Sequence, residues 1–454
     1  MAQNWRQSIH LEPQAGWLND PNGLCFSDGK YHVYFQYSPD SPKGAGRKCW
    51  GHFESSDDGK SWEYTGIVME PDTPEDRSGV YSGCAVVKDG ILHIFYTGNV
   101  KLPGDHDYVT SGREANQIYV TSKDGRTVSS KKIILRNSDY PEYCSCHVRD
   151  PKVWIENGIW KMVLGARTLE NKGCVLYYEA DDPENWHYVQ TLSIEDFGYM
   201  WECPDQFTVG DKVFLGISPQ GLPHEEFHHQ NVYSSGYFKK SGDALSDFEE
   251  FDYGFDFYAP QTFLDRNGEQ ILIGWMGIGD IPYSNPTTEL GWQHCLTVPR
   301  KLSLSEDGFI RQEPVIHPDL LGMSEEVAEG KAAEVELACE IESTIGEGRY
   351  EIQIGEGKIS YDGEILTLDL SAGQSGYGRT IRKVKTGRIG DIRVIADRSS
   401  LEVFADGGRY VMSTRFYPAD TRVKIVSEGG GFIFRPIREM EVRGFEQEKT
   451  GCNR

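Results

Sequence analysis

The chain has 454 residues, which is long for a single hydrophobic core, so two domains are expected. Hydrophobic residues make up 38% of it, and no apolar run approaches the ~18 residues that cross a bilayer, so a membrane-spanning protein is not expected. The formal net charge of -24 argues against nucleic acid and anionic membrane surfaces as partners, because both need clustered Lys and Arg.

Five copies of one pattern follow each other along the N-terminal part of the chain. Each copy is an apolar, aromatic and β-branched run, a short turn and a second such run, and the turns are Asp28-Gly29, Asp89-Gly90, Asn157-Gly158, Gly210-Asp211 and Asn267-Gly268. Asn-Gly and Asp-Gly between such runs predict β-hairpins, because a type I′ turn needs positive φ at both central residues. One four-stranded sheet per copy predicts a five-bladed β-propeller. The alternative is a long meander of hairpins in a sandwich.

Equivalent positions in the five copies hold carboxylates in three cases. Seven or eight residues before the turns stand Asp20, Asp150 and Glu202, whereas the other two copies have Tyr81-Ser82 and Ala259-Pro260 there. The equivalent ends of the inner strands of a propeller meet at the central axis. One such acid could be an ordinary turn or surface residue. Three in register predict a site at the axis.

The character of the chain changes after about residue 311. Glu313-Pro314 and His317-Pro318 interrupt the pattern and residues 319–333 are mildly helical, so residues 313–334 are expected to form a linker with a short helix. Residues 335–442 are strand-like, with a hairpin that turns at residues 406–408, and predict a β-sandwich. The expected domains are a catalytic propeller at 1–312 and a sandwich at 335–454.

Carboxylates in this arrangement suit the hydrolysis of a glycosidic bond. One carboxylic acid protonates the leaving oxygen, and a second carboxylate attacks the anomeric carbon or activates water. Glu202 has apolar sequence neighbours, which are expected to favour its protonated form. Arg149 beside Asp150 is expected to keep that carboxylate ionised, and Asp20 lies in a polar turn whose backbone amides can stabilise an anion.

Three short segments resemble the signatures of glycoside hydrolase family 32, the invertase and sucrose-6-phosphate hydrolase family. They are WLNDPNG at residues 17–23, RDP at 149–151 and ECP at 202–204. Further matches at 50–52, 81–83, 257–263, 296–300 and 400–404 extend the resemblance over nearly the whole chain. The resemblance implies an all-β protein, a five-bladed β-propeller followed by a C-terminal β-sandwich.

The resemblance also implies roles for the acids. Asp20 corresponds to the nucleophile, Glu202 to the general acid/base, and Asp150 to the residue that holds the fructosyl hydroxyls and stabilises the transition state. Such an enzyme retains configuration through a covalent fructosyl-enzyme and needs no metal and no organic cofactor. The implied substrate is a small sugar with a terminal β-D-fructofuranoside: sucrose, sucrose 6-phosphate or a short fructo-oligosaccharide. The residues expected to bind it are Asn19, Gln36, Trp50, Tyr81, Ser82 and Arg149.

The segment 42–50 departs from the family pattern. Many relatives carry an additional Trp here, and this chain has only Trp50, which is assigned as the aromatic that stacks on fructose. The same segment contains Lys43, Arg47 and Lys48, which suggest a phosphate site suited to sucrose 6-phosphate. The alternative for these three residues is a solvated loop.

Two other functions stay open. One is another five-bladed-propeller glycosidase, an inverting arabinanase-like enzyme, which the WLNDPNG segment and the C-terminal sandwich argue against. The other is a non-catalytic sugar-binding propeller, which the presence of all three acids argues against. The pattern leaves open the oligomeric state and whether water or a sugar accepts the fructosyl group.

The cysteines bear on location and on metals. Ten cysteines, with no apolar segment near Met1 that could act as a secretory signal, predict reduced thiols in a cytoplasmic protein. Residues 144–147, Cys-Ser-Cys-His, have no matching second cluster, so a zinc site is not expected there.

Overall fold

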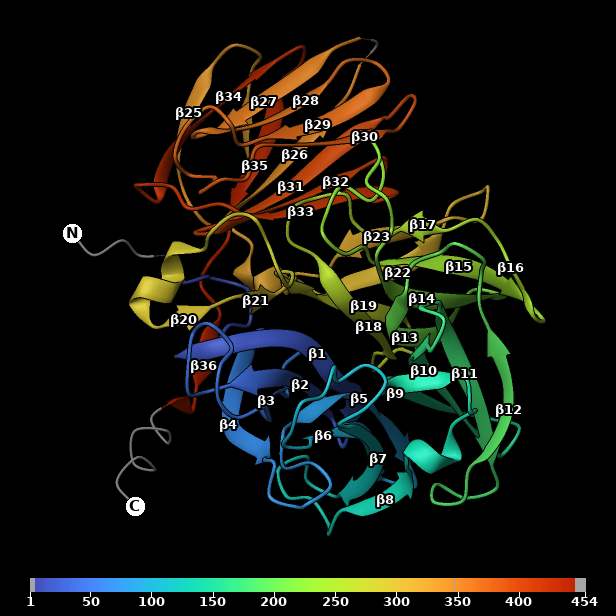
Figure 1. Ribbon diagram of the computed structural model, residues 1–454. Helices are drawn as coiled ribbons and strands as arrows, with labels where there is room; N and C mark the ends of the chain where they lie inside the picture. The colour runs from blue at the N-terminus through green and yellow to red at the C-terminus, as the bar shows by residue number, and fades with distance from the viewer. Residues whose placement is uncertain (1–4, 347, 446–454) are drawn as a thin grey trace.

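The computed structural model describes residues 5–346 and 348–445, so the outer ends of both predicted domains lie outside the described residues. Within these residues the regular structure consists of strands and three short 3-10 segments, η1 (Asn137–Asp139), η2 (Pro286–Leu290) and η3 (Pro318–Leu320). Five sheets form a ring, and two further sheets lie above it in the view of Figure 1. The predicted all-β class, a propeller followed by a sandwich, is confirmed.

Each sheet of the ring begins with one of the five predicted hairpins. The hairpins are β1 (Gly16–Ser27) with β2 (Lys30–Ser38), β5 (Val80–Lys88) with β6 (Ile91–Lys101), β9 (Cys144–Glu156) with β10 (Ile159–Thr168), β13 (Met200–Val209) with β14 (Lys212–Gln220), and β18 (Tyr258–Leu264) with β19 (Gln270–Met276). The outer strands are β3 (Cys49–Ser55) and β4 (Ser61–Met69); β7 (Arg113–Ser122) and β8 (Lys132–Leu135); β11 (Gly173–Ala180) and β12 (His187–Leu192); β15 (Gly236–Ser241), β16 (Ala244–Leu245) and β17 (Glu249–Glu250); and β21 (Cys295–Leu296), β22 (Arg300–Leu304) and β23 (Ile310–Pro314).

The hairpin turns follow the expected chemistry in three of the five blades. Both turn residues have positive φ at positions 28–29, 89–90 and 157–158, as a type I′ turn requires. In the fourth turn Gly210 has positive φ (62°) and Asp211 does not. In the fifth blade residues 265–269 connect the strands, so the two-residue turn expected at Asn267-Gly268 is not formed.

The inner strands touch one another around the axis. Strand β1 contacts both β5 and β18, and β5, β9, β13 and β18 follow each other round the ring. Two strands from later in the chain extend the first blade by parallel pairing: β20 (Trp292–Gln293) beside β1 and β36 (Glu441–Arg443) beside β4. These additions cover both edges of that sheet, which would otherwise expose unpaired backbone groups.

The sandwich consists of two six-stranded sheets around its own apolar core. One contains β24 (Glu325–Val327), β26 (Cys339–Thr344), β31 (Asp391–Asp397), β32 (Ser400–Ala405), β33 (Tyr410–Arg415) and β35 (Phe432–Pro436). The other contains β25 (Ala332–Glu336), β27 (Tyr350–Ile354), β28 (Gly357–Tyr361), β29 (Ile365–Asp369), β30 (Ile381–Lys385) and β34 (Arg422–Glu428).

The helical character predicted for residues 319–333 is wrong beyond the 3-10 segment η3. Strands β24 and β25 follow it, and they bury Val327 and Val335 in the sandwich core. The Ala and Glu residues of this stretch favour helix in isolation, but pairing with β35 and β34 overrides that weak preference.

Buried charges join the sandwich to the propeller. Arg300 on β22 pairs with Glu402 on β32 at 2.6 Å and with Asp252 at 3.2 Å. The two ring nitrogens of His10 contact Asp397 at 2.8 Å and Glu402 at 2.9 Å. None of these side chains is exposed to solvent, so each charge depends on its partners for stabilisation.

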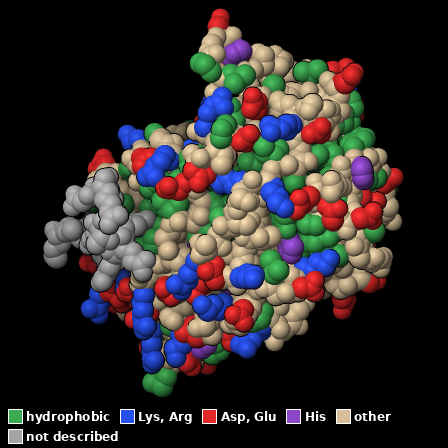
Figure 2. Space-filling view, turned by 90° about the horizontal axis from the view of Figure 1, so that it is seen from below, with side chains coloured by type: hydrophobic (Ala, Val, Ile, Leu, Met, Phe, Trp, Pro, Cys, Tyr) green, Lys and Arg blue, Asp and Glu red, His purple; other side chains and the backbone are tan. Residues whose placement is uncertain are grey.

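Charged side chains of both signs are mixed on the visible surface, and the described cysteines are unpaired. On the face shown in Figure 2, Lys and Arg side chains are mixed with Asp and Glu rather than gathered in one region. The described part of the chain contains no helix with the length and hydropathy that a bilayer crossing requires. Nine cysteines lie in the described residues, and all nine are free thiols.

Candidate active site

All five inner strands carry a β-bulge at the same level of the ring. The register shifts fall between residues 18 and 21, 80 and 83, 149 and 152, 202 and 205, and 258 and 261. Asp150, Cys203 and Ala259 have positive φ within these bulges. Proline, which lacks a backbone donor and so suits a bulge, lies in three of the five, at positions 151, 204 and 260. A bulge interrupts the alternation of a strand and re-aims its side chains, here towards the axis.

The bulged strand ends line one cavity of about 420 Å³, a volume within the usual range for small-molecule sites. The three acids predicted from the repeat register meet in this cavity. Five of the six predicted sugar-binding residues line it too, and the predicted residues in the lining are Asp20, Asp150, Glu202, Asn19, Gln36, Tyr81, Ser82 and Arg149.

Asp20 is held as an oriented carboxylate. Its Oδ2 accepts a hydrogen bond from the Ser82 hydroxyl at 2.6 Å, and its Oδ1 accepts one from the Asn19 amide at 3.1 Å. Burial raises the pKa of Asp20, the Ser82 and Asn19 hydrogen bonds oppose that rise, and the nearby charge of Glu202 adds to it. The result is a poorly solvated carboxylate with a fixed direction.

Glu202 is surrounded by donors. Arg149 Nε donates to Oε1 at 3.1 Å, while Gln220 Nε2 and the Tyr258 hydroxyl donate to Oε2 at 2.8 and 2.7 Å. The apolar setting expected from its sequence neighbours is therefore wrong. Consecutive side chains of a strand point to opposite faces, and Trp201 packs in a hydrophobic cluster, away from the polar partners of Glu202.

Asp150 has a different environment from the one expected. Its Oδ2 accepts the backbone N–H of Cys203 at 3.0 Å, and Arg149 Nε is 3.9 Å away because the guanidinium is directed to Glu202. Burial raises the pKa of Asp150 to about 7; Arg149 opposes the rise, and the charges of Glu202 and Asp20 add to it. The Arg149–Asp150 pairing that was expected to keep Asp150 ionised is thus a smaller effect than burial, which raises the pKa.

Trp50 does not line the cavity. Its indole is fully buried, donates from Nε1 to the Tyr81 carbonyl at 3.0 Å, and packs against Tyr34 and Tyr96. The structure therefore corrects the assignment of Trp50 as the stacking aromatic: it supports the backbone of Tyr81 from behind. The aromatic walls of the cavity, which the sequence argument missed as a set, are Trp17, Tyr233, Tyr258 and Trp275.

Basic side chains surround part of the cavity. Lys43 and Lys48 line it as the phosphate hypothesis expected, but Arg47 is turned away to Asp40 and Glu70. Arg113 and His147, which the sequence argument did not single out, are in the lining instead. No residue spacing links the segments that carry these four side chains, so only the folded ring brings them together.

Arg113 and Lys48 are anchored through neutral oxygens. Arg113 donates to Asn99 Oδ1 at 2.8 Å and to the Tyr108 carbonyl at 3.2 Å, and Lys48 donates to Ser38 Oγ at 2.7 Å. Among the described residues neither Lys43, Lys48 nor Arg113 forms an ion pair with a carboxylate. Their charges thus remain available to an anionic group of a ligand.

Two family models together match almost the whole chain. The glycosyl hydrolases family 32 N-terminal domain matches residues 10–314, and the family 32 C-terminal domain matches residues 310–443. The chain belongs to glycosyl hydrolase family 32.

Similar family 32 proteins are found among both sequences and structures. The sucrose-6-phosphate hydrolase of Bacillus subtilis strain 168 is 36% identical over 94% of this chain and 92% of its own length, and a raffinose invertase of Escherichia coli is 36% identical over 93% and 91%. The structure of sucrose-6-phosphate hydrolase from Lactobacillus gasseri superposes with a TM-score of 0.88 at 26% identity, covering 97% of this chain and 94% of that one. A family 32 β-fructofuranosidase from Bombyx mori gives 0.83 at 28% identity, covering 97% and 95%.

Membership of family 32 confirms the prediction of a glycoside hydrolase. The arabinanase-like and the non-catalytic alternatives gain no support from the family models or from these relatives. The three acidic segments on which the resemblance rests lie on the first, third and fourth blades, in β1, β9 and β13.

Proposed function

We propose that this chain is a retaining β-fructofuranosidase that prefers sucrose 6-phosphate to unphosphorylated sucrose. The observation that carries the proposal is one cavity lined by three acids, Asp20, Asp150 and Glu202, and by the cationic side chains of Lys43, Lys48 and Arg113, in a chain whose net charge is -24. Relatives named sucrose-6-phosphate hydrolase support it.

The acids divide the reaction into two displacements. Glu202 gives its proton to the glycosidic oxygen while Asp20 Oδ2 or Oδ1 attacks the anomeric carbon of fructose, so the leaving sugar departs as an alcohol. Glu202 then takes a proton from water, which attacks the same carbon and releases Asp20. Two inversions restore the starting configuration. Asp150 accepts hydrogen bonds from fructosyl hydroxyls and, when ionised, stabilises the positive charge that develops on the ring.

Hydrogen bonds from neighbouring side chains fix the directions of the Asp20 and Glu202 carboxylates for both displacements. Ser82 and Asn19 fix the direction of the Asp20 carboxylate, so little reorganisation is needed at attack. Tyr258 and Gln220 hold one oxygen of Glu202, and Arg149 holds the other, so the direction of this side chain is fixed too. When Asp20 becomes an ester its charge leaves the cavity, and the carboxylate form of Glu202 is then free to act as the base.

The basic side chains supply the substrate preference. A phosphate monoester carries almost two negative charges, and Arg113, Lys48 and Lys43 offer donors that no carboxylate of the described residues neutralises. Because the rest of the protein is strongly acidic, a local group of cations also guides an anionic sugar to this opening. We also propose a cytoplasmic location, which the nine free thiols of the described residues suit. As to the domains, we assign catalysis to the propeller. We place the start of the sandwich between the end of β23 at Pro314 and the beginning of β24 at Glu325.

Steady-state kinetics on sucrose and sucrose 6-phosphate test the proposal. Asp20→Asn and Glu202→Gln should each lower kcat by at least ~10³-fold on both substrates. Arg113→Gln should lower the ratio of kcat/KM for the phosphorylated sugar to that for sucrose by ~10–100-fold, the loss of one charge-assisted contact. Arg47→Gln is the matched control, because Arg47 binds Asp40 and Glu70 outside the cavity and should leave the ratio unchanged.

Wild-type enzyme that hydrolyses sucrose as efficiently as its phosphate would contradict the preference while leaving the β-fructofuranosidase assignment intact. Full activity of Asp20→Asn would contradict the assignment itself. The raffinose invertase among the relatives makes the unphosphorylated sugar the natural comparison.

A further inference from the structure

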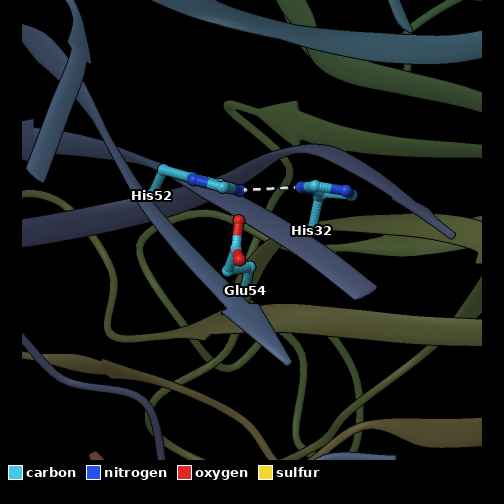
Figure 3. A group of neighbouring side chains, drawn as sticks. All are labelled: His32, His52 and Glu54. Carbon is cyan, nitrogen blue, oxygen red and sulfur yellow. Dashed lines mark hydrogen bonds between the residues drawn. The ribbon is translucent and has the colours of Figure 1, made fainter. Parts of the chain in front are cut away.

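Three ligand-type side chains converge on the outer part of the first blade, away from the cavity. His32 on β2 faces Glu54 on β3 as a cross-strand pair, and His52 lies two residues before Glu54 on the same face of β3. One nitrogen or oxygen atom from each residue lies within 4.8 Å of the others. Figure 3 shows the two imidazole rings edge to edge, with the Glu54 carboxylate directed to the gap between them. His32, His52 and Glu54 are all buried.

The second blade provides an internal reference for this position. His93 stands where His32 stands, four residues after the equivalent hairpin turn begins, and the strand pairings place Tyr119 and Thr121 where the first blade has His52 and Glu54. There a single hydrogen bond, His93 Nδ1 to the Tyr119 hydroxyl at 2.7 Å, satisfies the ring. The second blade thus has a His–Tyr pair at this place and no cluster of metal-ligating groups among these three residues.

In the first blade, three metal-ligating groups stand at the positions that His93, Tyr119 and Thr121 occupy in the second. His32 Nδ1 and His52 Nε2 are joined by a hydrogen bond of 3.1 Å, drawn dashed in Figure 3. Two nitrogen ligands at roughly 2.0–2.1 Å from a tetrahedral ion lie about 3.3 Å apart, so the two rings have the separation of a chelating pair.

Each candidate ligand also has an outer partner that fixes its orientation. His52 Nδ1 contacts Thr65 Oγ1 at 2.7 Å, His32 has a backbone hydrogen bond to Ser27, and Glu54 Oε2 accepts from Arg126 Nε at 3.2 Å. Outer contacts of this kind hold the ligands of metal sites in place.

We propose that His32, His52 and Glu54 bind one divalent transition-metal ion of the Zn²⁺ type, with a water molecule in the fourth position. Two imidazoles and one carboxylate are a donor set that suits this ion. The ion would tie β2 to β3 beside the loop of the second blade at Gly125, whose carbonyl accepts from Tyr34. None of the three ligands lines the catalytic cavity, so its role is to stabilise the blade and not to take part in hydrolysis.

Two cationic side chains compete with a metal ion for the Glu54 carboxylate. Substitutions can therefore be designed both to weaken and to strengthen metal binding. Lys30 and Arg126 pair with Glu54 from the solvent side, and their side chains are 38% and 41% exposed. They can rotate outwards as an ion enters, but they compete for the carboxylate and lower the affinity. Arg126 has Glu63 as a second partner at 2.8 Å, to which it can remain bound.

The experiment is titration of the chelator-treated full-length protein with Co²⁺, followed by visible absorption, and with Zn²⁺, followed by calorimetry. One ion per chain is expected, with the intense absorption of tetrahedral Co²⁺. His52→Gln and Glu54→Gln should each weaken binding at least tenfold, whereas the double variant Lys30→Gln/Arg126→Gln should strengthen it about tenfold. His93→Gln is the matched control, with unchanged binding. Hydrolytic activity of every variant checks that the propeller is folded.

Two results would overturn the proposal. The first is the absence of a tetrahedral Co²⁺ spectrum in both the wild type and the Lys30→Gln/Arg126→Gln variant. The second is weak ion binding that all variants share, since ions held loosely by the acidic surface would give it. A gain of affinity in the double variant cannot arise from misfolding, so it keeps the test decisive even if His52→Gln folds poorly.

Discussion

The pH dependence of stability should report the charge of His10. This residue lies between the two bodies of the protein, with one ring nitrogen on Asp397 and the other on Glu402. Burial by itself lowers the pKa of His10, but the hydrogen bonds and charges of the two carboxylates outweigh burial and raise it to about 9 from 6.5. The folded protein thus favours the protonated ring.

The size and direction of the effect follow from that shift. The difference between 9 and 6.5 is about 2.5 pKa units, and at 1.36 kcal/mol per unit the charged ring contributes about 3 kcal/mol to the free energy of unfolding. Because the folded pKa of His10 is the higher one, this stabilisation is complete below pH 6.5. It declines between pH 6.5 and about 9 and is absent above that range.

Urea unfolding of the wild type and of His10→Gln at pH ~6 and pH ~9.5 measures the effect. Other titrating groups act on both proteins alike, so the change in their stability difference between the two pH values isolates His10. We expect the difference in free energy of unfolding between wild type and His10→Gln to be about 3 kcal/mol smaller at the higher pH. His93→Gln, whose ring pKa is lowered by burial, should show no such loss over this range. A stability difference for His10→Gln that is equal at both pH values would refute the reasoning.

Three further predictions concern the cavity and its support. The acid limb of the kcat/KM profile should lie near pH 7, because Asp150 works as an anion and burial raises its pKa to about 7; full activity at pH ~5 would contradict this. Tyr258→Phe removes a 2.7 Å hydrogen bond to Glu202 and should lower kcat ~10-fold with little change in KM, measured at saturating substrate. Trp50→Phe should lower the melting temperature but change KM less than twofold, since the indole is buried behind the cavity; a large rise in KM would restore its stacking role.

Local chemistry determined much of this architecture from the sequence. Turn residues with positive φ and strand-forming runs on each side are short-range signals, so five hairpins and their common register could be predicted without knowledge of the fold. That register was enough to predict that Asp20, Asp150 and Glu202 meet. Where the local signal was weak, as in the Ala- and Glu-rich residues 325–336, pairing with distant strands decided the outcome.

The environments of the acids depended on the tertiary structure. Arg149 is adjacent to Asp150 in sequence yet binds Glu202, 53 residues away, because a bulge turns each strand end and neighbouring side chains of a strand diverge. Trp50 has a favourable position in sequence for sugar stacking, but its indole is fully buried behind the Tyr81 backbone and does not line the cavity.

The sequence by itself therefore determined which residues can do the chemistry, through residue type and spacing along single strands. The tertiary structure decided which of them share an environment. Arg113 and His147 join Lys48 only when three blades close into a ring, and contacts across blades are what set burial, charge and pKa. Such contacts depend on the packing of many distant residues at once, so no local pattern records them.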